Sequence, residues 1–239
     1  MVGQVGRLHT DREYEAELKA LLERVLFMGA RVEEQLVGAL RAYADQNGPV
    51  AEEIAANDVQ VDRLELDIDK ACIQLLARRQ PVASDLRFIT TTLKVVTDLE
   101  RIGDLATNIC ERVMEIGGAP AGVRPKILIE MGEAARNMLH DAMDALVAGD
   151  ARKAQEVVER DIAIDQQYAA LFPVIAQQMS TEPSEVDNLM RTLSIGKYIE
   201  RVADHATNLA EMVVFMVEGR DVRHLQASEE ERDRKDRLN

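Results

Sequence analysis

Apolar residues return every three or four positions along most of this chain, which is the spacing that places them on one side of an α-helix. In the first such stretch, Leu18, Leu21 and Val25 begin a series that continues to Leu40. Residues that favour turns, chiefly Gly, Pro and Asn, separate this stretch from those that follow. The pattern predicts six helices, over residues 13–46, 51–79, 84–116, 125–148, 151–179 and 181–218.

Two residues predict local features of these helices. Ser84 follows a break at Gln80 and Pro81, and its hydroxyl is suited to cap the N-terminus of the third helix by accepting a hydrogen bond from a free backbone N–H. Pro173 lies inside the fifth helix and has no N–H to donate. We therefore expect a kink or a short break at that point.

The order of the helices predicts the architecture. Long helices joined by turns of a few residues run antiparallel to their neighbours. A run of Gly, Pro and Ala at residues 117–122 separates three helices from three. We expect an all-α fold of two tandem, pseudo-symmetric three-helix bundles, made of six long antiparallel helices, at residues 1–119 and 120–220. Residues 228–239 alternate acidic and basic side chains with hardly an apolar residue, which predicts a charged, disordered tail at residues 221–239.

One stretch of the chain, from Leu99 to Val113, occurs twice. It returns one hundred positions later, from Ile199 to Val213, with eight of the fifteen residues identical, which indicates a duplication. Read as a helix, each copy has an apolar side, which should be buried, and an acidic side, which should keep contact with water. The apolar side consists of Leu99, Ile102, Ala106 and Ile109 in the first copy and of Ile199, Val202, Ala206 and Leu209 in the second.

The acidic side of each copy places two carboxylates one helical turn apart, as in Glu100 and Asp104. Carboxylates at this spacing repel and weaken a helix by roughly a few tenths of a kcal/mol unless a cation lies between them. The helix before each copy carries acidic residues at the same spacing. Two interpretations stay open at this point: a cation site, or a solvated face that Arg101 and Arg201 neutralise locally.

The composition narrows the range of partners and compartments. The 239 residues carry a formal net charge of −14, the sequence pI is near 4.8, and no segment gathers Lys and Arg without acids between them. This balance argues against nucleic acid and favours cations or basic protein surfaces. No segment has the roughly 18 uncharged apolar residues of a membrane span, and residues 1–19 lack the apolar core of a signal peptide, so we expect a cytoplasmic protein.

The core should consist mainly of aliphatic side chains. Hydrophobic residues make up 46% of the chain, but aromatic residues make up only 3% and Trp is absent, a balance that suits packed helices. Cys72 and Cys110 both fall on apolar sides of expected helices. We interpret them as buried core residues rather than as a disulfide or metal thiolates.

With this plan of helices, the chain resembles the PhoU family of phosphate-regulon regulators over nearly its whole length. The resemblance depends on residues 98–104 (Asp-Leu-Glu-Arg-Ile-Gly-Asp), 198–208 and 218–224. It implies two similar three-helix bundles, each binding metal ions at a Glu-or-Asp-x-x-x-Asp pair that faces a second pair on the preceding helix. The implied ligands are Asp58, Asp62, Glu100 and Asp104, and Asp161, Asp165, Glu200 and Asp204, with Asn108, Asn208, Arg101 and Arg201 as supporting residues.

The resemblance also implies a cofactor and a function. Carboxylate oxygens suit hard cations such as iron, Mn²⁺ or Mg²⁺, whereas a structural zinc site would need clustered Cys or His. Members of the family resemble adaptors: they are peripheral cytoplasmic proteins, usually homodimers, that damp the phosphate-starvation response. They are expected to contact a sensor histidine kinase and the ATPase subunit of the phosphate transporter, to meet the membrane only through these partners, and not to be enzymes.

Two other classes of protein fit parts of the pattern. A ferritin-like di-metal carboxylate enzyme is also a helical bundle, but it needs Glu-x-x-His on two helices, and none of the four His residues follows a Glu at that spacing. A helical scaffold without a metal ion is the second alternative. Among single residues, His205 fits a surface histidine beside the acidic stripe better than a ligand. Arg101 and Arg201 fit ion pairs better than phosphate binding.

Overall fold

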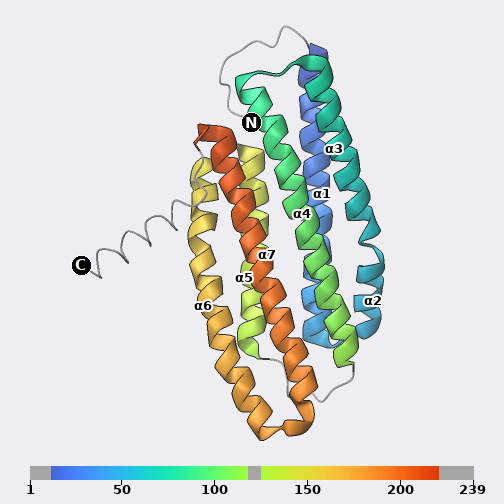
Figure 1. Cartoon of the computed structure of the whole chain (residues 1–239), viewed down its shortest axis with the longest axis vertical. Coiled ribbons are helices and arrows are strands. Elements are labelled where there is room, and N and C mark those ends of the chain that lie inside the picture. Colours follow the sequence, from blue (N-terminus) through green and yellow to red (C-terminus); the bar gives the residue numbers. More distant parts are fainter. Residues whose placement is uncertain (1–11, 118–124, 221–239) are drawn as a thin grey trace, which may run out of the picture.

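The computed structural model describes residues 12–117 and 125–220. These residues are almost entirely helical and contain no strand (Figure 1). The expected tail at 221–239 and the expected boundary at 119–120 lie outside them. The elements are α1 (Arg12–Asp45), α2 (Gly48–Ala56), α3 (Val59–Arg79), α4 (Ala83–Ile116), α5 (Lys126–Ala148), α6 (Ala151–Thr181), the 3-10 helix η2 (Pro183–Glu185) and α7 (Val186–Glu218).

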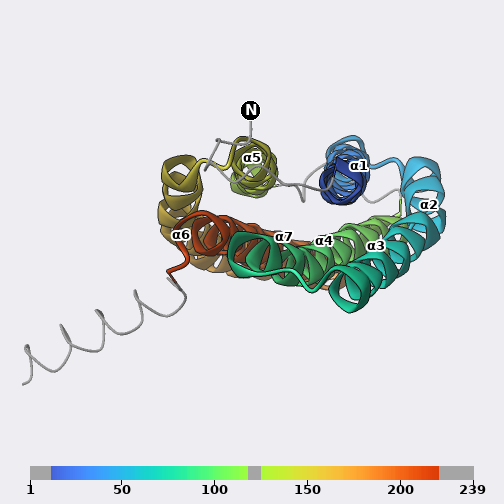
Figure 2. The ribbon, with the colours of Figure 1, turned by 90° about the horizontal axis from the view of Figure 1, so that it is seen from above.

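The helices form two layers. Figure 2 shows α3, α4, α7 and α6 side by side in one layer and α1 and α5 in the other. The first three-helix bundle consists of α1, α3 and α4, with α2 as a short addition beside α1 and α4, and the second consists of α5, α6 and α7. Contacts of α4 with α7 and of α1 with α5 join the two bundles. The predicted all-α fold of two tandem bundles is thereby confirmed.

The second expected helix is divided into α2 and α3, so the prediction of one continuous helix is wrong. Asn47 caps α2, because its side chain accepts a hydrogen bond from the Val50 backbone N–H at 3.2 Å, and the helix starts earlier than expected. Asn57 and Asp58 separate the two helices, and Asn57 Nδ2 donates to the Glu53 carbonyl at 2.9 Å. Asn and Asp side chains compete with the helix for backbone hydrogen bonds, which explains the break.

Two local predictions, at Ser84 and at Pro173, can be compared with the structure. α4 begins at Ala83, and Ser84 makes no capping hydrogen bond, so the predicted cap is wrong; the Ser84 hydroxyl instead donates to the Asp85 carboxylate at 3.4 Å. α6 continues through Pro173, so the short break, one of the two features expected there, is absent, and the kink stays a prediction. Because Leu171 and Ile175, two residues to either side of Pro173, are buried, packing against the rest of the bundle holds the helix together despite the missing backbone hydrogen bond.

The apolar sides of the two repeated stretches are buried, as predicted. Each fully buried Leu or Ile side chain contributes roughly 1.5–3 kcal/mol relative to an exposed one, so these helices are anchored by the sides that face the core. The carboxylates on the opposite sides of α4 and α7 keep contact with solvent. The buried residues, none more than 2% exposed, are Leu99, Ile102, Ala106, Ile109, Ile199, Val202, Ala206 and Leu209.

The two cysteines are core residues, as predicted. Cys72 and Cys110 are free thiols with no exposed surface. Burial, which disfavours a thiolate, raises the pKa of both to about 12. Neither side chain is suited to bind a metal ion as a thiolate at neutral pH.

The two halves contact each other reciprocally through α1 and α5. Gly29 on α1 lies against Met143 of α5, so that a Cβ at position 29 would collide with the Met143 side chain. The equivalent Gly132 on α5 lies against Leu40 of α1, where a Cβ would come within 2.7 Å of Leu40 Cδ2. When equivalent positions exchange contacts in this way, the two units are related by a two-fold axis. The bundles are therefore arranged with pseudo-two-fold symmetry.

Candidate metal centres

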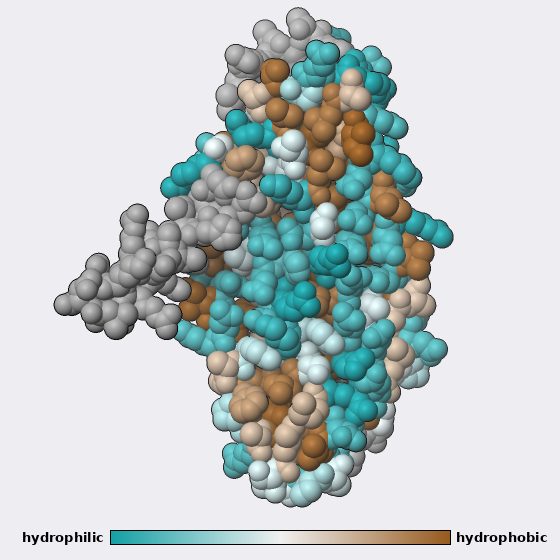
Figure 3. All heavy atoms as spheres, viewed as in Figure 1, coloured by the Kyte–Doolittle hydropathy of each residue, from teal (hydrophilic) through white to brown (hydrophobic). Residues whose placement is uncertain are grey.

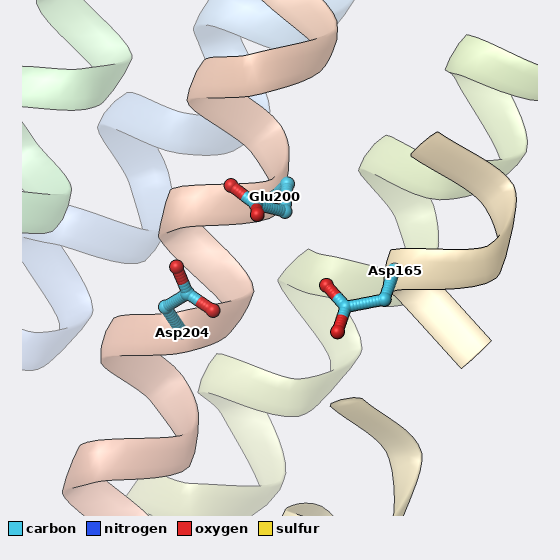
Figure 4. A group of neighbouring side chains, drawn as sticks. All are labelled: Asp165, Glu200 and Asp204. Atoms are coloured by element: carbon cyan, nitrogen blue, oxygen red, sulfur yellow. The ribbon is translucent and has the colours of Figure 1, made fainter. Parts of the chain in front are cut away.

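Three carboxylates meet on the surface of the second bundle. Glu200 and Asp204 lie one turn apart on α7, and Asp165 points toward them from α6 (Figure 4). One oxygen of each lies within 4.8 Å of the others, and over residues 12–117 and 125–220 no second group of three or more acidic, His or Cys side chains is this compact. The spacing allows one cation to be bound by all three side chains.

The electrostatics of this group reflect unbalanced negative charge. Burial raises the pKa of the Asp204 carboxyl to about 6, and the charges of Glu200 and Asp161 add to the rise. Burial and the neighbouring Asp165 also raise the pKa of Asp161, and one oxygen of Asp161 is buried without a hydrogen-bond partner. A cation would lower these pKa values by stabilising the charged carboxylates. Asp161 thus lies beside the compact group as a candidate fourth ligand.

A lysine that the sequence prediction missed partly neutralises the same group. Lys197 Nζ lies 2.6 Å from Glu200 Oε1 and 5.5 Å from the centre of the Tyr168 ring. The equivalent residue in the first copy is Thr97. The sequence did contain a signal for this ion pair: Lys197 precedes Glu200 by three residues, and side chains at that spacing meet on a helix.

The equivalent residues of the first bundle do not come together as closely. Within the described residues of that half, no three carboxylates lie within the same 4.8 Å limit. Arg101 lies between two of them: its Nη1 is 3.4 Å from Asp104 Oδ2, and its Nε is 3.5 Å from Glu100 Oε2. Burial raises the pKa of both carboxyl groups, and Asp62 and Glu65 on α3 add to the negative charge around Glu100. Glu65 was outside the predicted set, although it belongs to the same acidic stripe.

Asp58 is hydrogen-bonded to a side chain of α1, and its charge adds to the raised pKa of Asp104. Gln35 on α1 is buried and donates through Nε2 to Asp58 Oδ1 at 2.9 Å and to Thr107 Oγ1 at 3.0 Å. The amide therefore links α1, α4 and the start of α3. The sequence analysis did not identify Gln35. It could have been noticed as a polar residue on the otherwise apolar side of the first helix.

His205 and the residues predicted to support the centres differ in their contacts. His205 Nδ1 lies 2.8 Å from Asp98 Oδ1, and Asn208 Nδ2 donates to the same oxygen at 3.3 Å. The interpretation of His205 as a surface histidine is therefore wrong, because this side of α7 faces α4. Arg201 is exposed and forms no ion pair with any described residue, whereas Arg101 pairs with carboxylates of its own helix. Asn108 is half-buried on α4.

The chain matches the PhoU domain at residues 25–113 and 128–213. It is 36% identical over 220 residues to the phosphate-specific transport system accessory protein PhoU homolog of Pseudomonas putida, which covers 91% of this chain and 85% of the relative. It is 32% identical over 221 residues to the phosphate-specific transport system accessory protein PhoU of Escherichia coli, which covers 92% of each.

Two crystal structures share the fold. PhoU from Pseudomonas aeruginosa superposes with a TM-score of 0.84 and 32% identity, covering 87% of this chain and all of the other. The phosphate transport system regulatory protein PhoU from Streptococcus pneumoniae superposes with a TM-score of 0.82 and 30% identity, covering 88% of this chain and 99% of the other. The two domain matches fall one in each bundle, in agreement with the duplication. The chain therefore belongs to the PhoU family.

Proposed function

We propose that this chain is an accessory protein of phosphate-specific transport that negatively regulates the phosphate-starvation response and modulates phosphate uptake. Family membership in both halves carries the proposal, because relatives that cover more than nine-tenths of the chain are named as accessory proteins of that system. In the proposal the chain works at the cytoplasmic side as an adaptor without catalytic activity. It contacts a sensor histidine kinase and the ATPase subunit of the phosphate transporter.

Two observations favour an adaptor over the ferritin-like enzyme. The compact group in the second bundle consists of carboxylates alone, and His205, the histidine nearest to it in sequence, is turned to Asp98. A separate finding is that no helix among the described residues is both long enough and apolar enough to cross a membrane.

A deletion strain tests the regulatory role. A reporter driven by a phosphate-starvation promoter should become active in phosphate-rich medium when the gene is removed, because the proposed negative regulator is lost. Expression of the intact chain from a plasmid should restore repression, and the empty plasmid should not. A reporter that stays repressed in the deletion strain would exclude the proposed role.

We also propose that the acidic clusters bind a divalent or trivalent metal ion, with iron, Mn²⁺ and Mg²⁺ as candidates. In the second bundle Asp165, Glu200 and Asp204 would hold the ion and Asp161 would complete the set, because four carboxylates in one place repel unless a cation joins them. Elemental analysis of protein purified without chelator separates this proposal from a metal-free scaffold. A preparation without bound metal that also fails to take up added Mn²⁺ would favour the scaffold.

In the first bundle the proposed ligands are Asp58, Asp62, Glu100 and Asp104. Here metal binding requires a rearrangement, because Arg101 lies between two of the carboxylates and Gln35 holds Asp58. We expect the second bundle to bind the ion more tightly, since its group is already assembled.

The family resemblance leads us to propose a homodimer as well. Sedimentation equilibrium should give twice the chain mass of 26.7 kDa at micromolar concentration. A single-chain mass at every concentration would contradict this proposal and leave the other two unaffected.

A further inference from the structure

The second half of α6 carries no charge. None of the sixteen residues 166–181 is charged, in a chain in which 30% of the residues are. Because Asp161 is equivalent to Asp58, this stretch corresponds to residues 63–78 of α3, which carry six charged side chains. The positions that differ are exposed: Gln166, Ala170, Phe172 and Pro173 take the places of Arg63, Asp67, Asp69 and Lys70. Packing inside the bundle therefore does not explain the missing charges.

Large apolar side chains are exposed on and beside this stretch. On α6, Phe172 is 63% and Val174 40% exposed, and on the neighbouring α7, Val186 is 36% and Met190 51% exposed. Figure 3 shows hydrophobic atoms gathered over α6 and α7 at the lower end of the molecule. We call the exposed side chains of residues 166–181, together with Val186 and Met190, the tip surface. An apolar surface of this kind marks a contact with a partner.

The charges that border the tip surface argue against a lipid partner. Glu182 and Asp187 follow the uncharged stretch and are exposed. The nearby Arg191 already pairs with Glu115, with Nε 3.1 Å from Oε2. Membranes with anionic headgroups attract Lys and Arg and repel carboxylates. The tip surface therefore fits a protein partner better than a membrane.

The lack of charge makes the tip surface suited to a second copy of this chain. Two copies that each carry a net charge of −14 repel, and contact is least unfavourable where no charged side chains face each other. A two-fold axis places the same residues of both copies opposite each other. A charged side chain would then meet its like, whereas Gln can pair with Gln because an amide both donates and accepts. Gln166 and Gln177 are both exposed on the tip surface.

The corresponding end of the first half is less suited to such a contact. Ile73 and Leu86 are exposed there, but Ile73 lies within one turn of Asp69 and Lys70. A two-fold axis through this surface would bring charged side chains close to their own copies. The apolar exposure is thus present at both ends, whereas only the second end combines it with a long uncharged helix surface.

We propose that two copies of this chain pair through the tip surface, with α6 of one copy against α6 of the other. The uncharged stretch is about 24 Å long, at 1.5 Å per residue. Phe172 provides a large apolar contact, and the small Ala169 and Ala170 allow the two helices to approach closely. The inference rests on the homodimer of the proposed function and assigns its interface.

Sedimentation equilibrium over a range of concentrations gives the Kd of the dimer and tests the inference. Two variants introduce the residue of the equivalent first-half position: Phe172→Asp, after Asp69, and Met190→Thr, after Thr90. Phe27→Asp is the matched control, because Phe27 is 58% exposed on α1. Circular dichroism would verify that each variant is folded. Co-sedimentation with vesicles of phosphatidylglycerol and phosphatidylcholine tests the lipid alternative.

We expect Phe172→Asp to raise the Kd by about a hundredfold or more, because each dimer loses two apolar contacts and gains two facing charges. Met190→Thr should raise the Kd by about tenfold, and Phe27→Asp should leave it unchanged. A Kd that neither tip variant changes would overturn the interface while the homodimer stands. A wild-type chain that stays single at every concentration would refute the homodimer itself, and with it the inference. Vesicle binding that Phe172→Asp abolishes at an unchanged Kd would assign the tip surface to lipid and overturn the inference.

Discussion

Nδ1 of His205 on α7 lies 2.8 Å from Oδ1 of Asp98 on α4, across the boundary between the two bundles. The two side chains are only 18% and 16% exposed, and Asn208 Nδ2 donates to the same oxygen. The positions equivalent to this pair hold Leu105 and Tyr198. The two central helices are thus joined by a polar contact on one side of the pseudo-two-fold axis, with no matching acid and histidine on the other.

Asp98→Ala should destabilise the protein by about 1–3 kcal/mol, because it leaves the His205 ring and the Asn208 amide half-buried without their shared acceptor. Urea unfolding at neutral pH measures the change. Glu52→Ala on the exposed side of α2 is the matched control and should change the free energy of unfolding by less than about 0.5 kcal/mol. Equal stability of Asp98→Ala and wild type would show that the pair adds nothing to the contact between the bundles.

The reciprocal glycines give a second prediction. Replacing Gly by Ala in a helix interior stabilises the folded state by roughly 1 kcal/mol. A Cβ added in a packed contact destabilises it by roughly 1–3 kcal/mol. Gly29→Ala meets the flexible end of Met143, which can move aside, whereas Gly132→Ala meets the stiffer Leu40. We expect Gly132→Ala to be less stable than Gly29→Ala in thermal unfolding. The reverse order would show that Leu40 adapts more easily than Met143.

The helix positions and the buried sides of the repeated stretches could be predicted from sequence, because a period of 3.6 residues places Leu99 and Ile102 on the core side of a helix whatever that helix packs against. The break at Asn57 and Asp58 could not be predicted, since it depends on a few hydrogen bonds of short polar side chains. The surroundings of His205 could not be predicted from the sequence either. The helix period places His205 next to the acidic stripe, but its contact with Asp98 arises only because one bundle packs on the other.

The same limit applies to the candidate metal centres. Both acidic stripes follow from the spacing of residues such as Glu100 and Asp104, and the duplication makes them look alike. Their unequal assembly depends on side-chain contacts that the helix period does not fix, both between helices and within one helix. Gln35 reaches from α1 to Asp58, and Arg101 inserts between two carboxylates of its own helix, so single-helix periodicity could not predict that the second group is the compact one.

The stability of the metal-free protein should increase as the pH falls from about 7 to 5. Asp204 has a pKa of about 6 in the folded protein, above the usual value of about 4 that it regains on unfolding. Between these values the folded state binds more protons than the unfolded state, so lowering the pH favours folding. Asp204→Asn should flatten this dependence. Urea unfolding with chelator at pH 7, 6 and 5 measures the free energy of unfolding. If it changed equally with pH in the variant and in wild type, Asp204 would not be the source of the pH dependence.

Added Mn²⁺ should stabilise the fold, because an ion that binds only the folded state raises the free energy of unfolding by roughly 2.7 kcal/mol at a hundredfold excess over Kd. Asp204→Asn should remove more of this gain at low Mn²⁺ than Asp104→Asn, since the second group is already assembled. The double variant should lose most of it. Thermal unfolding with Mn²⁺ and then with chelator measures the effect, with Glu52→Gln as the control. A full metal response in the double variant would show that both stripes are solvated faces.

Lys197 should weaken metal binding in the second bundle. Its ammonium lies 2.6 Å from Glu200, so an incoming cation must displace it or share the carboxylate with it. An ion pair of this exposure contributes at most about 1 kcal/mol, and removing the competitor should therefore strengthen binding by up to about fivefold. Lys197→Thr makes the change, because Thr97 is the equivalent residue in the first bundle.

Isothermal titration with Mn²⁺ in an Asp104→Asn background would isolate the second centre for this measurement. The reciprocal variant Thr97→Lys, titrated in an Asp204→Asn background, should weaken the first centre for the same electrostatic reason. An unchanged Kd in Lys197→Thr would show that the ammonium leaves Glu200 at no cost. A higher Kd would show that Lys197 orients Glu200 toward the ion, in which case lysine and metal act together on one carboxylate and Thr97→Lys should not weaken the first centre.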